Sequence, residues 1–419
     1  MPQSAPLWFA AAVALSFAAG PAPSVPSPAG PARTSDLDSA QVARLLTELR
    51  RSDSTVCELA GRTLTNGWWG FGGSESEVPM PMPMPTPMPM PMAGPIAPMM
   101  EPGFRHGSDR YDDHALGAFR TVLRDPSPCL RNIAARVLGR ARRKGDFERF
   151  ESLLHDRDPA LRETGALALG TSGDRRALDL LRTTVKDANP AVRTLGVWAL
   201  GQLEDATAVA PLAEAARDES PQVRRVAAWA LGQGGGSADG RMGGWVGQAA
   251  DALMALLRDR DARVRMTAAH ALGQLESRPA IDALGAAVRD PAAEVRSTAI
   301  WALGQIEGAT SVPLVAVGLK DAEPEVRSLA AWALGQIDDA SAVDPLLAVV
   351  KNDSEPEVRV AAAWALGRID SPRATATLEG LKDDRSPSVR RAVRWALGRS
   401  DGDREGIRIH PRVRMRMRP

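Results

Sequence analysis

Nine aspartate–arginine pairs form the most regular arrangement of charged side chains in this 419-residue sequence. In each pair the aspartate precedes the arginine by six residues. The pairs are Asp125 and Arg131, Asp156 and Arg162, Asp187 and Arg193, Asp218 and Arg224, Asp259 and Arg265, Asp290 and Arg296, Asp321 and Arg327, Asp353 and Arg359, and Asp384 and Arg390. A single such pair would suggest acid–base chemistry. Nine copies at a regular interval predict a structural ladder of ion pairs, because structural pairs far outnumber functional ones.

Other side chains that could do chemistry are few and scattered. The sequence contains none of the short motifs H-E-x-x-H, C-x-x-C and G-x-S-x-G, and no phosphate-binding loop. The five histidines are His106, His114, His155, His270 and His410. We therefore predict no catalytic residues, no dedicated metal site and no cofactor, and we expect that the protein is not an enzyme.

The charged pairs lie within a repeated unit of 31 residues, with a longer step of 41 residues between Arg224 and Arg265. A fixed period in this range indicates a repeat array. In residues 223–233, five apolar side chains fall on one face at 100° per residue, whereas Trp229 and Gln233 fall on the opposite side. A second apolar-periodic segment, such as 208–216, precedes this helix. Each repeat is therefore predicted to be a hairpin of a helix A followed by a helix B.

Prolines support this assignment of helix B. A proline stands three residues before the arginine in seven copies, and proline in a first helical turn costs no hydrogen bond. These residues are Pro128, Pro159, Pro190, Pro221, Pro324, Pro356 and Pro387. The glycine that follows each Ala-Leu pair, such as Gly201, Gly232 and Gly304, is predicted either to permit close helix packing or to end the helix.

The pattern D-x4-V-R-x-x-A-A-x-A-L-G, followed closely by residues 290–304 and 321–335, resembles HEAT repeats. The likeness is to the short HEAT form of phycobilisome-lyase-like proteins and of designed arrays. It covers residues 112–399, with a degenerate first repeat at 36–66, and implies an all-α solenoid of about ten hairpins. It also implies that aspartate and arginine bond between neighbouring repeats and that helix B lines the concave side. HEAT-type hydroxylases bind iron through His-Glu dipeptides, and this sequence contains no His-Glu.

The segments outside the repeats differ sharply in composition. Residues 1–20 are predicted to be an export signal or an N-terminal anchor, because residues 7–19 form a short apolar run. Residues 21–35 are a Pro/Ala-rich spacer. Residues 67–111 form a Met/Pro/Gly-rich insertion, predicted to be a flexible loop or, alternatively, a Cu(I) site helped by His106 and His114.

Two further segments interrupt or follow the array. Residues 234–247 are predicted to be a glycine-rich loop between a helix B and the next helix A, at 248–258. Residues 400–419 form a basic tail that alternates arginine with apolar residues and is predicted to be a solvated terminus. The balance of 52 basic and 51 acidic residues gives no field that would favour nucleic acid, which is not an expected partner.

The two cysteines, Cys57 and Cys129, both fall near the start of a helix B, in repeats one and two. Equivalent residues of neighbouring helices lie roughly 8–10 Å apart, whereas a disulfide needs Cα atoms within about 7 Å. The offset of one position between the two cysteines could close this gap. They are therefore a candidate disulfide, in an exported protein.

Two rows of side chains lie on helix B away from its apolar face. The first row is Trp198, Trp229, Trp301, Trp332, Trp364 and Trp395. The second row is Gln202, Gln233, Gln274, Gln305 and Gln336. Either each tryptophan packs on the next repeat and widens the core, or the two rows line a groove for an extended partner. The sequence alone does not separate these alternatives.

From these features we predict a non-enzymatic, exported scaffold that binds a protein or peptide on the concave helix-B face. Family analogy offers a second hypothesis, an enzyme or enzyme subunit of the bilin-lyase or hydroxylase kind. Tryptophans beside glutamines also suit sugar rings, which gives a third hypothesis of glycan binding. A membrane is expected as a partner only if the N-terminal segment is not cleaved.

Overall fold

The computed structural model describes residues 39–52, 56–57, 111–236, 243–306 and 308–400. All of them belong to one compact unit, Asp38–Pro419. This part of the chain is built from α-helices and short 3-10 turns, and no strand occurs within it. The predictions for the N-terminal signal, the spacer, the Met/Pro segment and the basic tail fall outside the described residues.

The described helices alternate as predicted, so the all-α repeat fold is confirmed. Helix α2 (Ser39–Leu49) is helix A of repeat one. The other helices A are α4 (Asp113–Thr121), α6 (Asp146–Leu154), α8 (Leu178–Thr184), α10 (Val209–Ala215), α12 (Gly243–Leu256), α14 (Ile281–Ala287), α16 (Val312–Val317), α18 (Val343–Asn352) and α20 (Pro372–Glu379). The helices B are α5 (Pro128–Ala141), α7 (Pro159–Ser172), α9 (Pro190–Gln202), α11 (Pro221–Gly232), α13 (Ala262–Gln274), α15 (Ala293–Ile306), α17 (Pro324–Ile337), α19 (Pro356–Ile369) and α21 (Pro387–Ser400).

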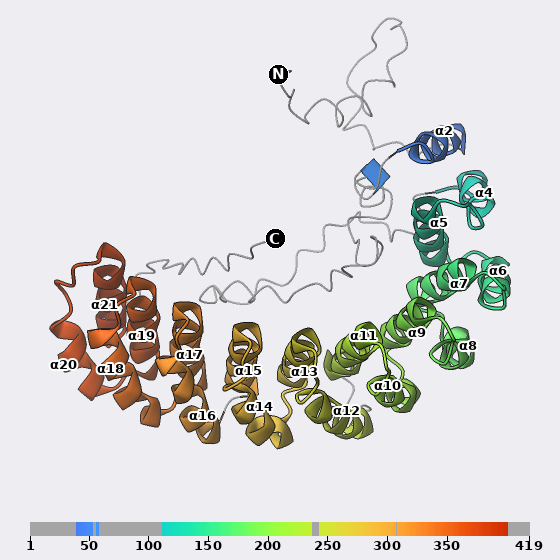
Figure 1. The fold of residues 1–419 in the computed structure, drawn as a ribbon. Coiled ribbons are helices and arrows are strands. Elements are labelled where there is room, and N and C mark those ends of the chain that lie inside the picture. The colour runs from blue at the N-terminus through green and yellow to red at the C-terminus, as the bar shows by residue number, and fades with distance from the viewer. Residues whose placement is uncertain (1–38, 53–55, 58–110, 237–242, 307, 401–419) are drawn as a thin grey trace, which may run out of the picture. The chain divides into compact units, whose positions relative to one another are not determined.

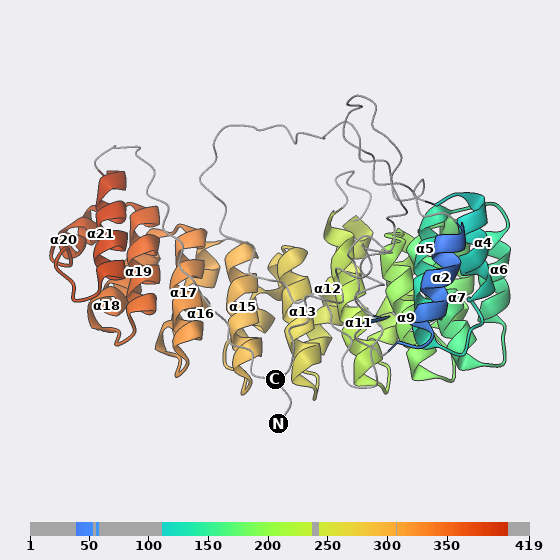
Figure 2. The ribbon, with the colours of Figure 1, turned by 90° about the horizontal axis from the view of Figure 1, so that it is seen from above.

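The helices form two layers, one of helices A and one of helices B (Figure 1). Each helix B packs against the helix B of the next repeat and against the helix A of its own repeat. Figure 2 shows the helices B side by side in chain order. Five helices A are preceded by a 3-10 turn that redirects the chain after helix B. These turns are Arg175–Ala177, Ala206–Ala208, Arg278–Ala280, Ala309–Ser311 and Ala340–Ala342.

The seven prolines three residues before an arginine all occupy the first position of their helix B. In the first six of these helices the residue before the proline is extended. At Asn189 (φ −86°, ψ 123°) the side chain also accepts hydrogen bonds from two backbone N–H groups of the first turn. A proline at this position has the φ of a helix and needs no hydrogen-bond acceptor. The start of helix B is therefore fixed locally by the sequence.

The repeated glycine lies inside helix B and permits close helix packing. Helix α17 continues past Gly335 to Ile337 and ends at Asp338, which has a left-handed conformation with φ 55°. A methyl group on Gly335 would lie 2.8 Å from Cα of Ala365 and 2.8 Å from Cζ3 of Trp364, both in the next repeat. Side chains do not approach backbone this closely, so only glycine allows this separation of α17 and α19.

The segment predicted to be a glycine-rich loop, residues 234–247, is helical from Gly243 onward. Helix α12 begins at Gly243, earlier than the expected 248, and Trp245 within it is only 2% exposed. Its indole N–H donates a hydrogen bond of 2.9 Å to the carbonyl oxygen of Leu231, at the end of α11. A methyl group on Gly234 would overlap this indole. The sequence interpretation missed this contact because a single tryptophan among glycines has no helical periodicity.

Replacing Gly335 with alanine should destabilise the array by about 1–3 kcal/mol, because the added methyl group has no space. Gly117, in α4, offers a matched control, since a methyl group there meets nothing within 4 Å. Gly117→Ala should stabilise the protein by up to about 1 kcal/mol through its gain in helix propensity. Urea unfolding of both variants measures the difference, and the same sign of change for both would contradict the packing argument.

Removing the Trp245 side chain should cost about 3–5 kcal/mol, at least as much as Leu303→Ala in the last turn of α15, because both changes leave a cavity among buried side chains. Trp245→Phe keeps most of the buried ring and loses only the hydrogen bond to Leu231. Its melting temperature should lie between those of the wild type and Trp245→Ala. An unchanged melting temperature for Trp245→Ala would show that the segment is an ordinary loop.

Candidate functional site

The aspartate–arginine pairs join each repeat to the next one. Arg193 donates from Nε to Oδ2 of Asp218 at 2.8 Å and from Nη2 to Oδ1 at 2.9 Å, and Asp218 lies one repeat further along the chain. Six junctions have this two-pronged bond, with Nε–Oδ2 distances of 2.6–2.8 Å. Arg359 reaches Asp384 through Nη2 alone, at 3.0 Å. The pairs are mostly buried, as for Arg224 and Asp259, each 8% exposed.

Each ladder side chain also binds the loop of its own repeat. The Nη1 atom of Arg193 donates to the carbonyl oxygens of Asp187 and Ala188, at 2.9 and 3.2 Å. Oδ1 of Asp187 accepts the backbone N–H of Asn189 at 2.8 Å. The guanidinium of Arg162 and this backbone donor lower the pKa of Asp187 below its usual value. The hydrogen bond between Arg162 and Asp187 also raises the pKa of Arg162.

The ladder is different at its N-terminal end. The carboxylate of Asp125 binds Arg50 of repeat one, with Nε at 3.0 Å, and Asp156 binds Arg124 at 2.7 Å. A disulfide links Cys57 to Cys129 across this first junction, with Cα atoms 6.0 Å apart. The first junction thus has a covalent bond in addition to its ion pair.

The tryptophan row is partly buried, and its members differ. Trp198 is only 2% exposed, so this residue does not belong to an open surface, contrary to the prediction for the row. The other five are half-buried: Trp229, Trp301, Trp332, Trp364 and Trp395. The equivalent positions in repeats two and three hold Arg136 and Leu167, which are 1% exposed. Burial lowers the pKa of Arg136 to about 10. The half-exposed aromatic row therefore begins at repeat five.

The tryptophans also hold neighbouring repeats together. A methyl group on Gly273 or Gly367 would lie 2.7 or 3.1 Å from Cζ3 of the tryptophan in the following repeat. The rings of Trp364 and Trp395 stack with centroids 6.4 Å apart and planes at 10°. His270, which takes the tryptophan position in repeat six, stacks on Trp301 at 4.7 Å. In Trp229, Trp301, Trp364 and Trp395 one edge of the ring therefore packs on the preceding repeat, while the side chain as a whole stays partly exposed.

The glutamine row lies one helical turn beyond the tryptophans. Gln202, Gln233, Gln305 and Gln336 are half-buried, and Gln274 is exposed. In repeat nine Arg368 takes this position, and its guanidinium lies 5.6 Å from the ring centroid of Trp364. The structure therefore places amide and tryptophan side chains side by side on five successive helices B, with His270 in place of tryptophan in repeat six.

A family model described as HEAT repeats matches residues 116–194, 183–241, 250–316 and 311–398. The chain belongs to the HEAT-repeat family. This confirms the resemblance seen in the sequence. No curated protein matches the chain.

The solved structures that this HEAT array is similar to include an engineered protein. It is 19% identical, with 86% of this chain and 98% of that chain covered and a TM-score of 0.46. Human deoxyhypusine hydroxylase in complex with glycerol is 23% identical, with coverage of 62% and 96% and a TM-score of 0.29. The complex of CpcE and CpcF of phycocyanin lyase from Nostoc sp. PCC7120 is 23% identical, with coverage of 54% and 93% and a TM-score of 0.34. No property of these proteins is carried over to this chain, because all three TM-scores are below 0.5.

The HEAT array also carries an acidic row that the sequence interpretation missed. Glu294, Glu325 and Glu357 occupy the same position in repeats seven, eight and nine, seven residues before Trp301, Trp332 and Trp364. All three glutamates are exposed. The signal was present in the sequence as a Glu-Val-Arg triplet in three successive repeats. It was overlooked because acidic residues in a first helical turn are common for reasons of helix stability alone.

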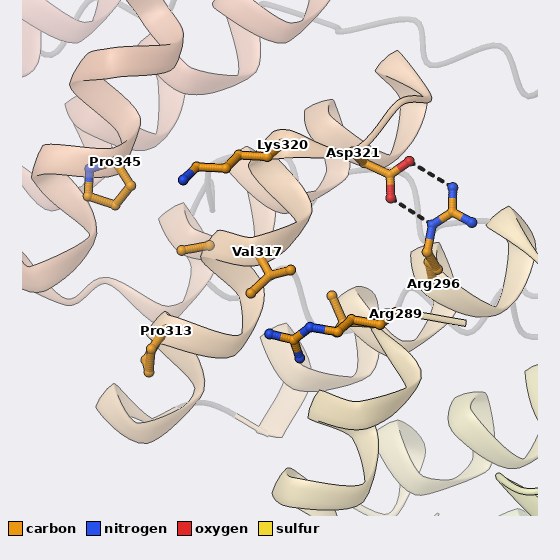
Figure 3. A pocket seen from close by; sticks show the side chains of 9 residues that line it. Arg289, Arg296, Pro313, Val317, Lys320, Asp321 and Pro345 are labelled. Atoms are coloured by element: carbon orange, nitrogen blue, oxygen red, sulfur yellow. Dashed lines mark hydrogen bonds and ion pairs between the residues drawn. The ribbon is translucent and has the colours of Figure 1, made fainter. Parts of the chain in front are cut away.

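The helix-A layer contains a hollow of about 520 Å³ between α14, α16 and α18 (Figure 3). Its apolar wall includes Pro313, Val317 and Pro345, and the cationic groups of Arg289 and Lys320 border it. The ladder pair of Arg296 and Asp321 closes one side (Figure 3).

Within the described residues, no group of three or more histidine, cysteine, aspartate and glutamate side chains could hold a metal ion. None of the helices in the same part of the chain has the length and hydrophobicity needed to span a membrane.

Because of His270, the stability of the array is predicted to fall in mildly acidic solution. Burial lowers its pKa from 6.5 to about 4. Between these values the unfolded chain binds the proton and the folded chain does not, so stability should fall as the pH falls from about 6.5 to 4. His270→Trp restores the residue type of the row and should remove this contribution. Urea midpoints at pH 7 and pH 5 test it, and equal losses in the variant and the wild type would contradict it.

Proposed function

We propose that this HEAT array is a scaffold that binds a protein or peptide along the half-exposed tryptophan and glutamine rows of helices B. The observation that carries the proposal is the half-buried state of Trp229, Trp301, Trp332, Trp364 and Trp395. Four of these indoles, all but Trp332, have one edge against a glycine of the preceding repeat. Ordered rings lose little conformational entropy when a partner covers them. An aromatic row of this kind is the type of surface on which binding energy concentrates.

The glutamine row supports an extended partner. Side-chain amides both donate and accept hydrogen bonds, which matches the N–H and C=O groups of an extended peptide backbone. The glutamines recur once per repeat from repeat four to repeat eight, so a segment that runs along these helices B meets a new amide at each one. A surface of packed tryptophans with adjacent amides is therefore suited to an extended partner peptide that crosses several repeats.

A variant of the rows should lose the partner without unfolding. Gln305 and Gln336 are half-buried. The atoms nearest to a methyl group on Gly304 belong to Ala333 and not to Trp332, so the Trp332 ring is not packed on the preceding glycine. The triple variant Trp332→Ala, Gln305→Ala, Gln336→Ala should reduce capture of a protein partner from an extract of the source cells at least tenfold, with an unchanged circular-dichroism spectrum. The reduction is expected because two or three central contacts commonly dominate binding.

The hollow of the helix-A layer provides a matched control. Arg289→Ala combined with Lys320→Ala alters exposed side chains of the same array on the other layer. This variant should capture the partner as well as the wild type. If the control variant loses capture, or if the row variant captures the partner fully, the partner binds a surface other than the two rows. Binding of the purified array to glycans but to no protein would favour the sugar hypothesis instead.

We also propose that the protein functions in an oxidising compartment outside the cytoplasm. The apolar run near the N-terminus supports export, and the Cys57–Cys129 bond supports it because disulfides persist mainly in such compartments. In protein isolated from its source with thiols blocked at lysis, both cysteines should be resistant to alkylation until a reductant is added. Two alkylatable cysteines in the untreated protein would contradict the proposal.

A further inference from the structure

The acidic row and the tryptophan row lie on one face of helices α15, α17 and α19. Glu294 precedes Trp301 by seven residues, which is close to two full turns of helix and about 10 Å along the axis. The same spacing recurs from Glu325 to Trp332 and in repeat nine. Each of the three repeats therefore presents an exposed carboxylate and a half-buried indole on the same side.

These carboxylates are not used by the array itself. The ladder pairs are formed by aspartates, and none of the ion pairs of the described residues involves Glu294, Glu325 or Glu357. All three glutamates lie in the first turn of their helices, where a negative charge is favourable, so their cost to the array is small. The acidic run ends at both sides, because the equivalent position is Arg263 in repeat six and Ser388 in repeat ten.

A cation already lies on one ring of this surface. The guanidinium of Arg368 is 5.6 Å from the ring centroid of Trp364, within the range in which a cation is attracted to an indole face. In the two preceding repeats the equivalent positions are the uncharged Gln305 and Gln336. A cationic side chain from outside would thus find both an indole and a carboxylate in those repeats.

We propose that the helix-B surface of repeats seven to nine binds an extended, cationic segment of another protein. This inference rests on the proposed function and names the chemistry of the partner at the same rows. An extended chain advances about 6.6 Å for every two residues, and neighbouring helices lie about 8–10 Å apart. The recognised segment therefore has arginine or lysine at every second or third position, with apolar residues between them that contact the indoles.

The chain itself contains a sequence of this kind. Residues 407–418, outside the described part, alternate arginine with isoleucine, valine and methionine. The experiment must therefore distinguish binding of another protein from binding of the chain's own tail. The variant that does so replaces the tail arginines with serine: Arg408, Arg412, Arg414, Arg416 and Arg418.

The test measures fluorescence anisotropy of a labelled twelve-residue peptide with arginine and valine at alternate positions, titrated with the full chain at low salt. Glu294→Gln, Glu325→Gln and Glu357→Gln together should raise the Kd about tenfold, which corresponds to about 1.4 kcal/mol. The control triple Glu148→Gln, Glu214→Gln, Glu379→Gln removes the same charge from exposed positions of helices A and should leave the Kd unchanged. A peptide with glutamate in place of arginine should not bind.

Three results would overturn the inference. If neither the wild type nor the tail variant binds the peptide although the wild type captures a partner through the rows, the partner is not cationic and the proposed function still holds. If the glutamate variant binds as the wild type does but the Trp332, Gln305 and Gln336 variant does not, the rows bind without the carboxylates. If only the tail variant binds the peptide, the occupant is the chain's own tail.

Discussion

The contact on which the array depends is the arginine fork between successive repeats. At six junctions the ladder arginine holds the loop of its own repeat with Nη1 and the aspartate of the next repeat with Nε and Nη2. The aspartate in turn binds the backbone that starts its own helix B, as Asp321 does with the N–H of Glu323 at 3.0 Å. One guanidinium therefore fixes two loops and one helix start, and this sets the position of each helix B relative to the last one.

The glycine contact determines how close these helices lie. At Gly201 a methyl group would lie 2.7 Å from Cβ of Ala230, so the glycine and the alanine of successive helices are matched in size. The close approach brings the indoles of Trp229, Trp301, Trp364 and Trp395 against the glycine of the preceding repeat. The tryptophan row is thus a product of the packing, and its regular spacing follows from the ladder. A surface that is repeated and rigid in this way is suited to an extended partner, because little order has to be created on binding.

Much of this architecture could be predicted from the sequence, because its determinants are local and repeated. A proline at the first helical position fixes the start of helix B, and the recurring Asp-x5-Arg spacing indicated a ladder. The fate of single side chains could not be predicted, because it depends on contacts between repeats. Trp198 and Trp229 occur in the same W-A-L-G-Q motif, yet the first is buried and the second is half-buried. Arg50 supplies the cation to Asp125 from outside the motif, and Trp245 packs from a segment without periodicity.

The most direct test of the account is a double-mutant cycle on Arg327 and Asp353, which join repeats eight and nine through hydrogen bonds of 2.8 and 3.1 Å. Urea unfolding of Arg327→Ala, Asp353→Ala and the double variant gives the coupling free energy between the two side chains. We expect a favourable coupling of about 1–3 kcal/mol, since the pair is largely buried and bound at two points. A coupling indistinguishable from zero would show that the fork does not hold the repeats together.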